Sequence, residues 1–446
     1  MSSRNQTPLR RRVLQSGSLT LAGYGLGQAL RFGGNLILTR LLFPEAFGLM
    51  AIIQIVIYGL HMLSDVGIET SIVQKDRGND PEFLNTAWTL QIIRGFLIWA
   101  CLCALSLPIA NFYGEPQLAS MIVVVGLTAI IIGFNSTKLS TAQRNLEAGR
   151  ITLIELGSST FGLLFTIYLA WLMKSVWALV WGNIISLSLK MFASHVALHG
   201  IKNQFQWDSG SLSHLRGFGR WIMLSSTLTF LSVEGARLLI STMLDMRQLA
   251  LFTLASAMNL MFWQAIQQLS SRVFFPAFAE TYRNNPKNLR SILYKSRLII
   301  ILPSFGLAVL FIFYGTQLMG IFYDERYHGS GSMLVVLSAG SLVSYIWGSY
   351  LSAFWAMGKV ATLTALTAIQ IACQFAAIYV GYNYWGGAGI VLGVAAANWI
   401  VYPAYAYVAY HNGLWHIKLD TILLSAAVLI LIFAWPQLML PSQIHF

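Results

Sequence analysis

The chain has 446 residues, of which 56% are hydrophobic and only 10% charged, and its mean hydropathy is +0.64. This composition lies far outside the range of water-soluble globular domains and predicts an integral membrane protein. The formal net charge of +12 does not indicate nucleic acid as a partner. Most of the excess lies in short loops, where it orients the chain in the membrane.

Thirteen apolar stretches, each long enough to cross a bilayer, follow one another along the chain. With about 20 apolar residues per span, the sequence predicts helices at 13–41, 46–65, 84–110, 117–137, 150–173, 176–199, 218–242, 248–275, 294–322, 332–356, 360–382, 387–410 and 419–437. The first stretch is too long for the apolar region of a signal peptide and precedes no small-residue cleavage pattern, so a retained helix is expected.

Positive charge in the loops predicts the orientation of these helices. Placing Arg4, Arg10, Arg11 and Arg12 on the cytoplasmic side makes every alternate loop cytoplasmic, because Lys and Arg are retained on that side. The tail and those loops then hold twenty Lys and Arg, Arg297 and Lys418 among them, against four on the opposite side. We therefore expect a multi-pass protein with a cytoplasmic N-terminus.

An internal duplication is predicted from the order of the helices. Shifting the chain by 202 residues superposes Gly17 on Gly219 and Leu26 on Leu228, and it also aligns helix ends and loops. The expected fold is all-α, with two six-helix lobes related by a parallel pseudo-two-fold repeat, as in some secondary transporters. The expected parts are a cytoplasmic basic tail at 1–12, a lobe at 13–200, a cytoplasmic linker at 201–217, a lobe at 218–412 and an additional C-terminal transmembrane helix at 413–446.

Motifs for catalysis or metal binding do not stand out in this sequence. The three cysteines lie within apolar spans, where Cys behaves as a small hydrophobe, and the histidines lack the paired spacing of a zinc site. We expect no cofactor or metal and no enzymatic activity. A membrane-embedded polysaccharide polymerase or ligase stays as an alternative, although a long charged outer loop that would suit it is lacking.

Polar residues within the spans predict a substrate path, because a charge that faces lipid costs several kcal/mol. At helical spacing they form stripes on the first two helices of each half. The predicted cavity residues are Tyr24, Gln28, Arg31, Asn35, Gln54, Tyr58, Glu234, Arg237, Trp263 and Gln267.

Several of these residues have an alternative structural interpretation. Glu234 and Arg237 stand three residues apart and would neutralise each other on one helix. His61 and Asp65, with Glu234, are candidates for proton coupling, but Asp65 is as well placed to cap a helix. Arg94, Glu155 and Lys190 lie nearer the cytoplasmic ends, where long side chains snorkel, so they are expected to be anchors.

Five motifs in the sequence resemble those of a known family. Residues 39–49 (TRLLFPEAFGL), 64–74 (SDVGIETSIVQ), 85–95 (NTAWTLQIIRG), 112–116 (FYGEP) and 175–180 (SVWALV) are similar to polysaccharide exporters of the multidrug, oligosaccharidyl-lipid and polysaccharide (MOP) transporter superfamily. The likeness is strongest to Wzx-like flippases of the colanic-acid-exporter type. That family often has an Asp directly before the position of Arg237, where this chain has Ala236.

The resemblance implies a flippase of the bacterial cell inner membrane. Its substrate would be an undecaprenyl-pyrophosphate-linked oligosaccharide, and its partners would be membrane lipids and the polysaccharide polymerase or export machinery. Arg31 and Arg237 would bind the pyrophosphate. Energy would come from an H⁺ or Na⁺ gradient, the membrane potential or consumption of the product. An ion-coupled drug or cation exporter of the same superfamily is the other transporter alternative, but it should favour buried carboxylates, and Glu234 is the only acidic residue that we place deep within a span.

Overall fold

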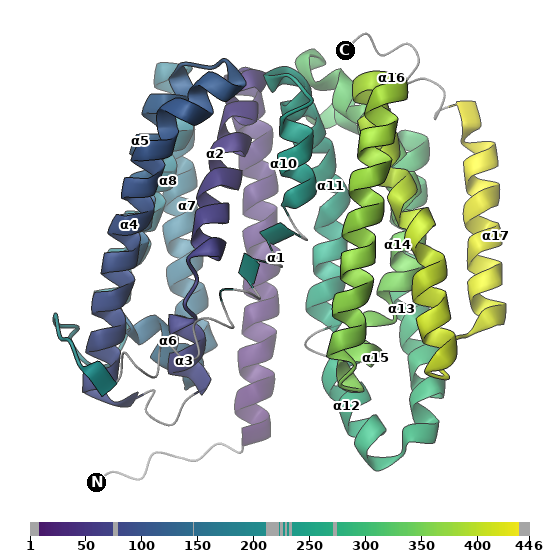
Figure 1. Ribbon diagram of the computed structural model, residues 1–446, viewed down its shortest axis with the longest axis horizontal. Helices are drawn as coiled ribbons and strands as arrows, with labels where there is room; N and C mark the ends of the chain where they lie inside the picture. Colours follow the sequence, from purple (N-terminus) through teal and green to yellow (C-terminus); the bar gives the residue numbers. More distant parts are fainter. Residues whose placement is uncertain are drawn as a thin grey trace. The chain divides into compact units, whose positions relative to one another are not determined.

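The computed structural model describes residues 9–74, 79–145, 147–210, 223, 226–227, 230–231, 234–270 and 274–436 (Figure 1). The chain divides into two compact units, Met1–Glu234 and Gly235–Phe446. The described residues of both units are helical apart from the connecting segments. The predicted domain boundaries stay a prediction, and residues 211–217 of the expected linker lie outside the described residues.

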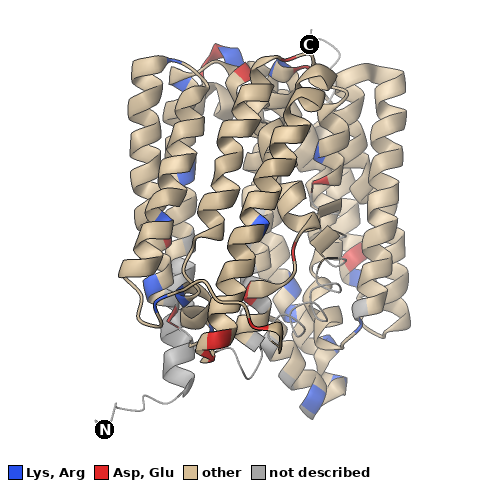
Figure 2. Cartoon of the chain, turned by 60° about the vertical axis from the view of Figure 1, so that its left-hand side comes forward, with Lys and Arg blue, Asp and Glu red and all other residues tan. Residues whose placement is uncertain are grey.

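The first unit is a bundle of long helices with two short ones at one end (Figure 1). Its elements are α1 (Leu9–Leu41), α2 (Pro44–Leu63), α3 (Ile68–Gln74), α4 (Pro81–Tyr113), α5 (Gln117–Gly133), α6 (Lys138–Arg144), α7 (Ala148–Met173) and α8 (Trp177–Val196). The main packing pairs are α4 with α5, α7 with α8, and α1 with α7. Charged residues gather mainly near the ends of the helices, with a few along their length (Figure 2).

The second unit is built around one central helix. Its elements are α10 (Gly235–Ser241), α11 (Met246–Leu269), α12 (Phe275–Asn284), η3 (Pro286–Asn288), α13 (Leu289–Phe322), η4 (Glu325–Tyr327), α14 (His328–Gly348), α15 (Leu351–Ala356), α16 (Val360–His411) and α17 (Ile417–Phe433). Helix α14 packs against α11, α13, α16 and α17, and every residue from Met333 to Gly348 is buried.

The predicted spans agree with the described helices over most of the chain. Within the described residues, six helical segments are long and apolar enough to cross a membrane, and α5 with α6, bent by 58°, makes a seventh. Spans 360–382 and 387–410 are confirmed as separate helices within α16, because Gly386 has a φ of 58° and breaks the helix there. Within span 218–242, residues 218–222, 224–225, 228–229 and 232–233 lie outside the described residues, and α10 covers most of its last part.

The segment between the predicted spans at 248–275 and 294–322 includes a helix that the sequence did not predict. It contains α12, whose Phe278 is 1% exposed and packs against Leu289 and Leu293 of α13. Two other short helices, α3 and α6, were also not predicted. All three are too short to give a span-length apolar signal, although each buries apolar side chains against its unit.

Small residues let α7 and α8 approach closely. A Cβ atom added at Gly162 would lie 2.4 Å from Ser186 Cβ and 3.0 Å from Ser186 Cα, so this position admits only glycine without a shift of α8. Close approach through small residues is the usual packing solution between helices in lipid, where the hydrophobic effect gives no attraction between them. A Cβ added at Gly157, also on α7, would meet nothing within 4 Å.

We predict that Gly162→Val lowers the thermal midpoint of the purified protein in detergent and that Gly157→Val lowers it much less. Both substitutions place a β-branched residue in the same helix, so their difference isolates the overpacking at Ser186, about 1–3 kcal/mol. Thermal denaturation followed by size-exclusion chromatography measures it. Equal midpoints for the two variants would contradict the close packing of α7 on α8.

Candidate functional site

The carbonyl end of α2 is capped by Arg94 of α4. The Arg94 guanidinium donates to the backbone oxygen of His61, and its Nε donates to Ser64 Oγ at 3.1 Å. Ser64 Oγ in turn donates to the Leu60 oxygen. A cation at the C-terminus of a helix satisfies unpaired carbonyls and interacts favourably with the helix dipole. Arg94 is therefore a cap, not the snorkelling anchor that we expected.

Asp65 follows this cap and holds the turn into α3. Its Oδ1 accepts from the backbone N–H of Gly67 at 2.9 Å, and its Oδ2 accepts from Ser226 Oγ at 2.9 Å. Gly67 has a φ of 65°, a conformation that glycine adopts without strain. The capping alternative for Asp65 thus has direct support. The neighbouring His61 differs, since its Nε2 is buried and has no hydrogen-bond partner among the described residues.

An aromatic contact continues this polar stripe along α2. The Tyr58 and Phe230 rings lie 6.2 Å apart, and Phe230 packs over Gly59, where a Cβ atom would lie 3.0 Å from Phe230 Cζ. The backbone N–H of Glu234 donates to the Phe230 oxygen at 2.8 Å. Ser226 and Phe230 therefore lie against α2 and the turn that follows it, so Tyr58, Asp65 and Phe230 share one side of the first unit.

The other predicted residues of the first unit lie on α1 and α2. Arg31 and Gln54 are exposed, whereas Gln28 and Asn35 are half-buried. The side chain of Tyr24 lies outside the described residues. Helix α1 packs on α7 through its glycines: Cβ atoms at Gly23 and Gly34 would meet α7 side chains at 2.1 and 2.4 Å.

In the second unit, the predicted site residues lie on α10 and α11. Arg237 and Gln267 are half-buried. The ring centroid of Trp263 lies 6.3 Å from that of Tyr345 and 5.6 Å from that of Trp347, so this side chain packs at the α11–α14 interface. Arg31 and Glu234 belong to the first unit and Arg237 to the second.

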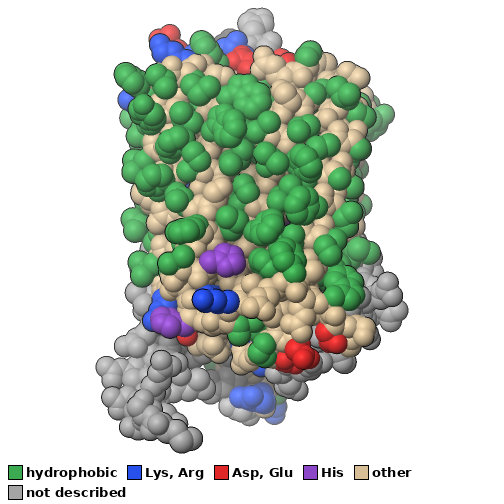
Figure 3. Space-filling model, turned by 90° about the vertical axis from the view of Figure 1, so that its left-hand side faces the viewer, with side chains coloured by type: hydrophobic (Ala, Val, Ile, Leu, Met, Phe, Trp, Pro, Cys, Tyr) green, Lys and Arg blue, Asp and Glu red, His purple; other side chains and the backbone are tan. Residues whose placement is uncertain are grey.

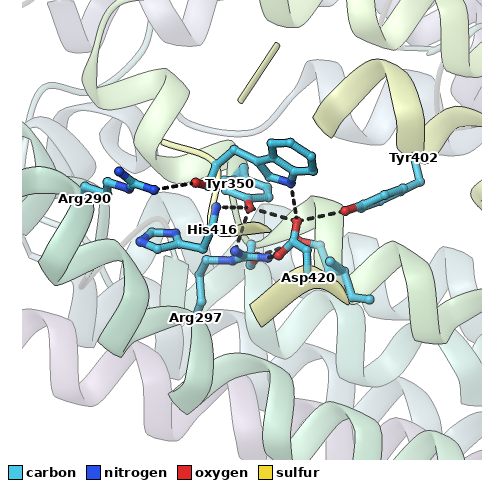
Figure 4. A network of polar contacts seen from close by, with 9 residues as sticks. Arg290, Arg297, Tyr350, Tyr402, His416 and Asp420 are labelled. Carbon is cyan, nitrogen blue, oxygen red and sulfur yellow. Dashed lines mark hydrogen bonds and ion pairs between the residues drawn. The ribbon is translucent and has the colours of Figure 1, made fainter. Parts of the chain in front are cut away.

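A buried ion pair in the second unit was missed by the sequence analysis (Figure 4). Arg297 Nη2 on α13 lies 2.6 Å from Asp420 Oδ1 on α17, and the side chains are 0% and 1% exposed. Arg297 Nε donates to Ser349 Oγ at 2.8 Å, and Nη1 donates to Tyr350 Oη at 2.6 Å. The guanidinium carbon lies 3.9 Å from the Tyr350 ring centroid.

The Asp420 carboxylate accepts hydrogen bonds from three further side chains. Its Oδ2 accepts from Tyr350 Oη at 2.9 Å, Tyr402 Oη at 2.9 Å and Trp415 Nε1 at 3.1 Å. These contacts join α17 to α13, to the α14–α15 junction and to α16. Buried charges are tolerated when every donor and acceptor has a partner, as here.

The connection between α16 and α17 completes this network. Arg290 Nη2 donates to the Trp415 oxygen at 3.0 Å, and the backbone N–H of His416 points at Tyr350 Oη (Figure 4). Burial, together with the guanidinium groups of Arg297 and Arg290, lowers the pKa of the His416 imidazole. A neutral imidazole at this position avoids adding a third cation to the cluster.

Two sequence expectations are corrected by this network. Arg297 was counted among the loop cations that orient the chain, but it lies within α13 and is fully buried. Glu234 was taken as the only acidic residue deep within a span, whereas Asp420 is buried and Glu234 half-buried. The sequence signal for Asp420 was an acidic residue just inside the apolar stretch at 419–437.

Asp420→Asn should lower the thermal midpoint strongly, because it leaves the buried Arg297 charge uncompensated, at a cost of about 3–5 kcal/mol. The double variant Arg297→Met, Asp420→Leu should recover much of the loss, since apolar pairs replace buried ion pairs well. Denaturation in detergent measures both variants.

The matched control is Glu155→Gln, which breaks the Lys190–Glu155 pair, where the side chains are 28% and 53% exposed. That pair should contribute about 0–1 kcal/mol. If Asp420→Asn were no more destabilised than Glu155→Gln, the buried pair would not hold α17 in place.

Two units of helices, several of them long and apolar enough to cross a membrane, define the class of multi-pass membrane proteins. Within the described residues, no three His, Cys, Asp or Glu side chains form a group that could hold a metal. A family model described as "Polysaccharide biosynthesis protein" matches residues 37–331, and the chain belongs to this family. The description of this family names polysaccharide biosynthesis.

Curated relatives agree with this assignment. The chain is 21% identical to the lipopolysaccharide biosynthesis protein WzxC of Escherichia coli K12, over 88% of this chain and 78% of WzxC. It is 19% identical to the succinoglycan biosynthesis transport protein ExoT of Rhizobium meliloti, over 61% of this chain and 55% of ExoT. The resemblance to Wzx-like exporters is thereby confirmed.

Solved structures confirm the all-helical membrane fold. A multidrug resistance MATE family transporter of the MOP superfamily superposes with a TM-score of 0.70 and 14% identity, over 87% of this chain and 94% of that one. The lipid II flippase MurJ superposes with a TM-score of 0.69 and 13% identity, over 92% of this chain and 91% of that one. At such identities the likeness shows the fold alone.

Proposed function

We propose that this protein flips an undecaprenyl-pyrophosphate-linked oligosaccharide from the cytoplasmic to the outer leaflet of a bacterial inner membrane, by alternating access. The product would feed exopolysaccharide or surface polysaccharide assembly. The observation that carries the proposal is the exposed Arg31 guanidinium on α1, which the sequence predicts to span the membrane.

The depth of Arg31 supports an aqueous path. Ten residues separate Arg31 from Leu41 at the end of α1. At a rise of about 1.5 Å per residue this is about 15 Å, half of a hydrocarbon core about 30 Å thick. A charge at the midplane faces water or a partner and not lipid. A guanidinium there offers paired donors to a pyrophosphate, and Arg237 would supply a second set.

Neighbouring side chains fit a sugar substrate. Gln54 and Tyr58 are exposed on α2, and Gln28 and Asn35 lie half-buried on α1. Amides would hydrogen-bond sugar hydroxyls, and the tyrosine ring would pack on a sugar face. Tyr24, Trp263 and Gln267 are also included in the proposed path. Because Trp263 packs at the α11–α14 interface, the movement of its side chain is restricted.

The relatives' names also support a polysaccharide substrate. WzxC and ExoT are named for polysaccharide biosynthesis, and MurJ is named as a flippase of lipid II. The MATE and MurJ superpositions are nearly equal, so the fold does not separate export of drugs from flipping of lipid-linked sugars. Organic-cation export is therefore an outcome that the experiment below must distinguish.

Energy coupling is the second part of the proposal. His61, Asp65 and Glu234 are the candidate proton carriers, and an H⁺ or Na⁺ gradient or the membrane potential would drive the cycle. Among them His61 is favoured, because its Nε2 lacks a partner among the described residues whereas Asp65 is engaged in its turn. We place the N-terminus in the cytoplasm, and the polymerase or export machinery would be the partner that receives the product.

We predict that Arg31→Ala slows transfer of a lipid-pyrophosphate oligosaccharide between leaflets by about tenfold or more, the equivalent of one charge-assisted hydrogen-bond pair. Leaflet accessibility in vesicles that contain the purified protein measures the rate. The matched control is Arg247→Ala, because Arg247 is also exposed but lies in the first turn of α11.

Loss of transfer in both variants would point to general damage, which the thermal midpoints would reveal. Unchanged transfer in Arg31→Ala would remove Arg31 from the path. If neither the wild type nor the variants transferred the lipid, while the wild type exported organic cations on an imposed proton gradient, the flippase proposal would be wrong.

His61→Gln should abolish the response of transfer to an imposed proton gradient while leaving slow gradient-independent transfer, because glutamine does not titrate. His199→Gln is the control, since His199 lies outside the helices and contacts Arg150. The measurement is the ratio of rates with and without the gradient. An unchanged ratio in His61→Gln would exclude His61 as the coupling residue.

A further inference from the structure

The segment after α8 docks along the first turns of α4 through every second backbone N–H. The N–H groups of Gln204, Gln206 and Asp208 donate to Asn85 Oδ1, Thr89 Oγ1 and Thr86 Oγ1, each at 3.1 Å. A period of two is the pattern of an extended strand. We call residues 201–208 the strap, and Figure 1 shows it beside the lower end of α4.

Side chains lock the register of the strap. Asn85 Nδ2 donates to Gln206 Oε1 at 3.1 Å, and Ser136 Oγ donates to Asn203 Oδ1 at 2.7 Å. Ile201 packs against a buried cluster that includes Phe83. Asn85, Thr86 and Thr89, which receive the strap, are at most 9% exposed, so it covers their side chains fully.

The opposite side of the strap presents two large aromatic residues outward. Phe205 is 68% exposed and Trp207 is 55% exposed. The Phe205 ring lies 5.0 Å from the Trp88 ring, which supports its base while its outer part stays free of the protein. Together these two outward aromatic side chains form an apolar surface that is suited to contact with lipid or with a protein partner.

The face of α4 that holds the strap continues as an exposed apolar stripe. Thr89, Ile93 and Leu97 follow one another at a spacing of four, which keeps them on one face, and Ile93 and Leu97 are 40% and 61% exposed. At about 1.5 Å per residue, Ile93 lies only about 6 Å beyond Thr89 along the helix. Because α4 is long and apolar enough to cross a membrane, such an exposed stripe is suited to face lipid.

Basic side chains lie at the same end of the first unit as the strap. Lys202 on the strap is exposed, and Arg150 lies 2.7 Å from His199 immediately before it. Figure 3 shows the apolar surface of this side ending at a band of charged and histidine side chains. Basic residues bordering an apolar surface are suited to anionic lipid headgroups.

We propose that the strap is a preformed membrane anchor, in which Phe205 and Trp207 insert into the interfacial layer of the leaflet at this end of the first unit and Lys202 contacts lipid phosphates. Trp favours this layer because its ring is apolar and its N–H remains hydrogen-bonded. The hydrogen bonds to α4 order the segment beforehand, so insertion costs little conformational entropy. The anchor would fix the depth of the first unit whatever its substrate.

The test places a fluorescent probe on the strap. Cys101, Cys103 and Cys373 are replaced by serine, Trp207→Cys is labelled with an environment-sensitive NBD group, and the protein is reconstituted in vesicles of phosphatidylcholine with phosphatidylglycerol. Lipids carrying a nitroxide near the headgroup should quench the probe several-fold more than lipids carrying it at the chain end. Gln206→Cys, whose position faces Asn85 of α4, should show weak lipid quenching.

A second variant keeps the proposal open to refutation. Thr86→Val and Thr89→Val together remove two acceptors of the strap at nearly constant side-chain shape, and they should reduce headgroup quenching at position 207 and increase quenching by aqueous iodide. Strong iodide quenching at position 207 with both threonines present would overturn the proposal. So would protection from iodide and lipid quenchers alike, which would mean that a protein surface covers the aromatics.

Discussion

Inside a membrane a charged side chain must find its counterpart within the protein, and this constraint shapes the whole chain. Arg94 meets it by capping α2, and Arg297 meets it by pairing with Asp420. Each solution also joins separate elements, α4 to α2 in the first case and α13 to α17 in the second. Polar pairs therefore specify which helices are neighbours, whereas small residues such as Gly162 specify how closely they approach.

Arg31 differs from Arg297, because it lies on a helix that the sequence predicts to span the membrane and its side chain is exposed. Retaining such a residue is costly unless water or a ligand reaches it. Arg297, in contrast, is fully buried among its partners. We therefore distinguish a charge with a structural role from a charge that a ligand or water could reach. Exposure of the charged side chain is therefore a better guide to a transport path than its depth in a span. Depth alone does not distinguish Arg31 from Arg297.

The sequence predicted the spans because apolar length is a local property, and it predicted the break at Gly386 because glycines and polar residues interrupt the stretch there. It did not predict the Arg297–Asp420 pair, because the partners are 123 residues apart in the sequence. Each of them also lies near the start of its predicted span, where charged residues are common. Helical periodicity placed Tyr58, His61 and Asp65 on one stripe, but the end of α2 at Leu63 puts Asp65 in the following turn. Helical periodicity predicts the face of the helix on which a residue lies, whereas the hydrogen bonds of its side chain decide its structural role.

Helix α14 is buried along nearly its whole length, although it carries several serines. Ser341 and Ser344 donate to carbonyls of α14 at 3.1 and 2.8 Å, and Ser330 donates to the Tyr327 carbonyl just before the helix at 2.5 Å. During synthesis α14 emerges after α13 but before α16 and α17, the neighbours that later cover it. A helix that satisfies its own hydroxyls can enter lipid before those neighbours exist, so the serines that help α14 pack at the centre of the unit do not oppose its insertion.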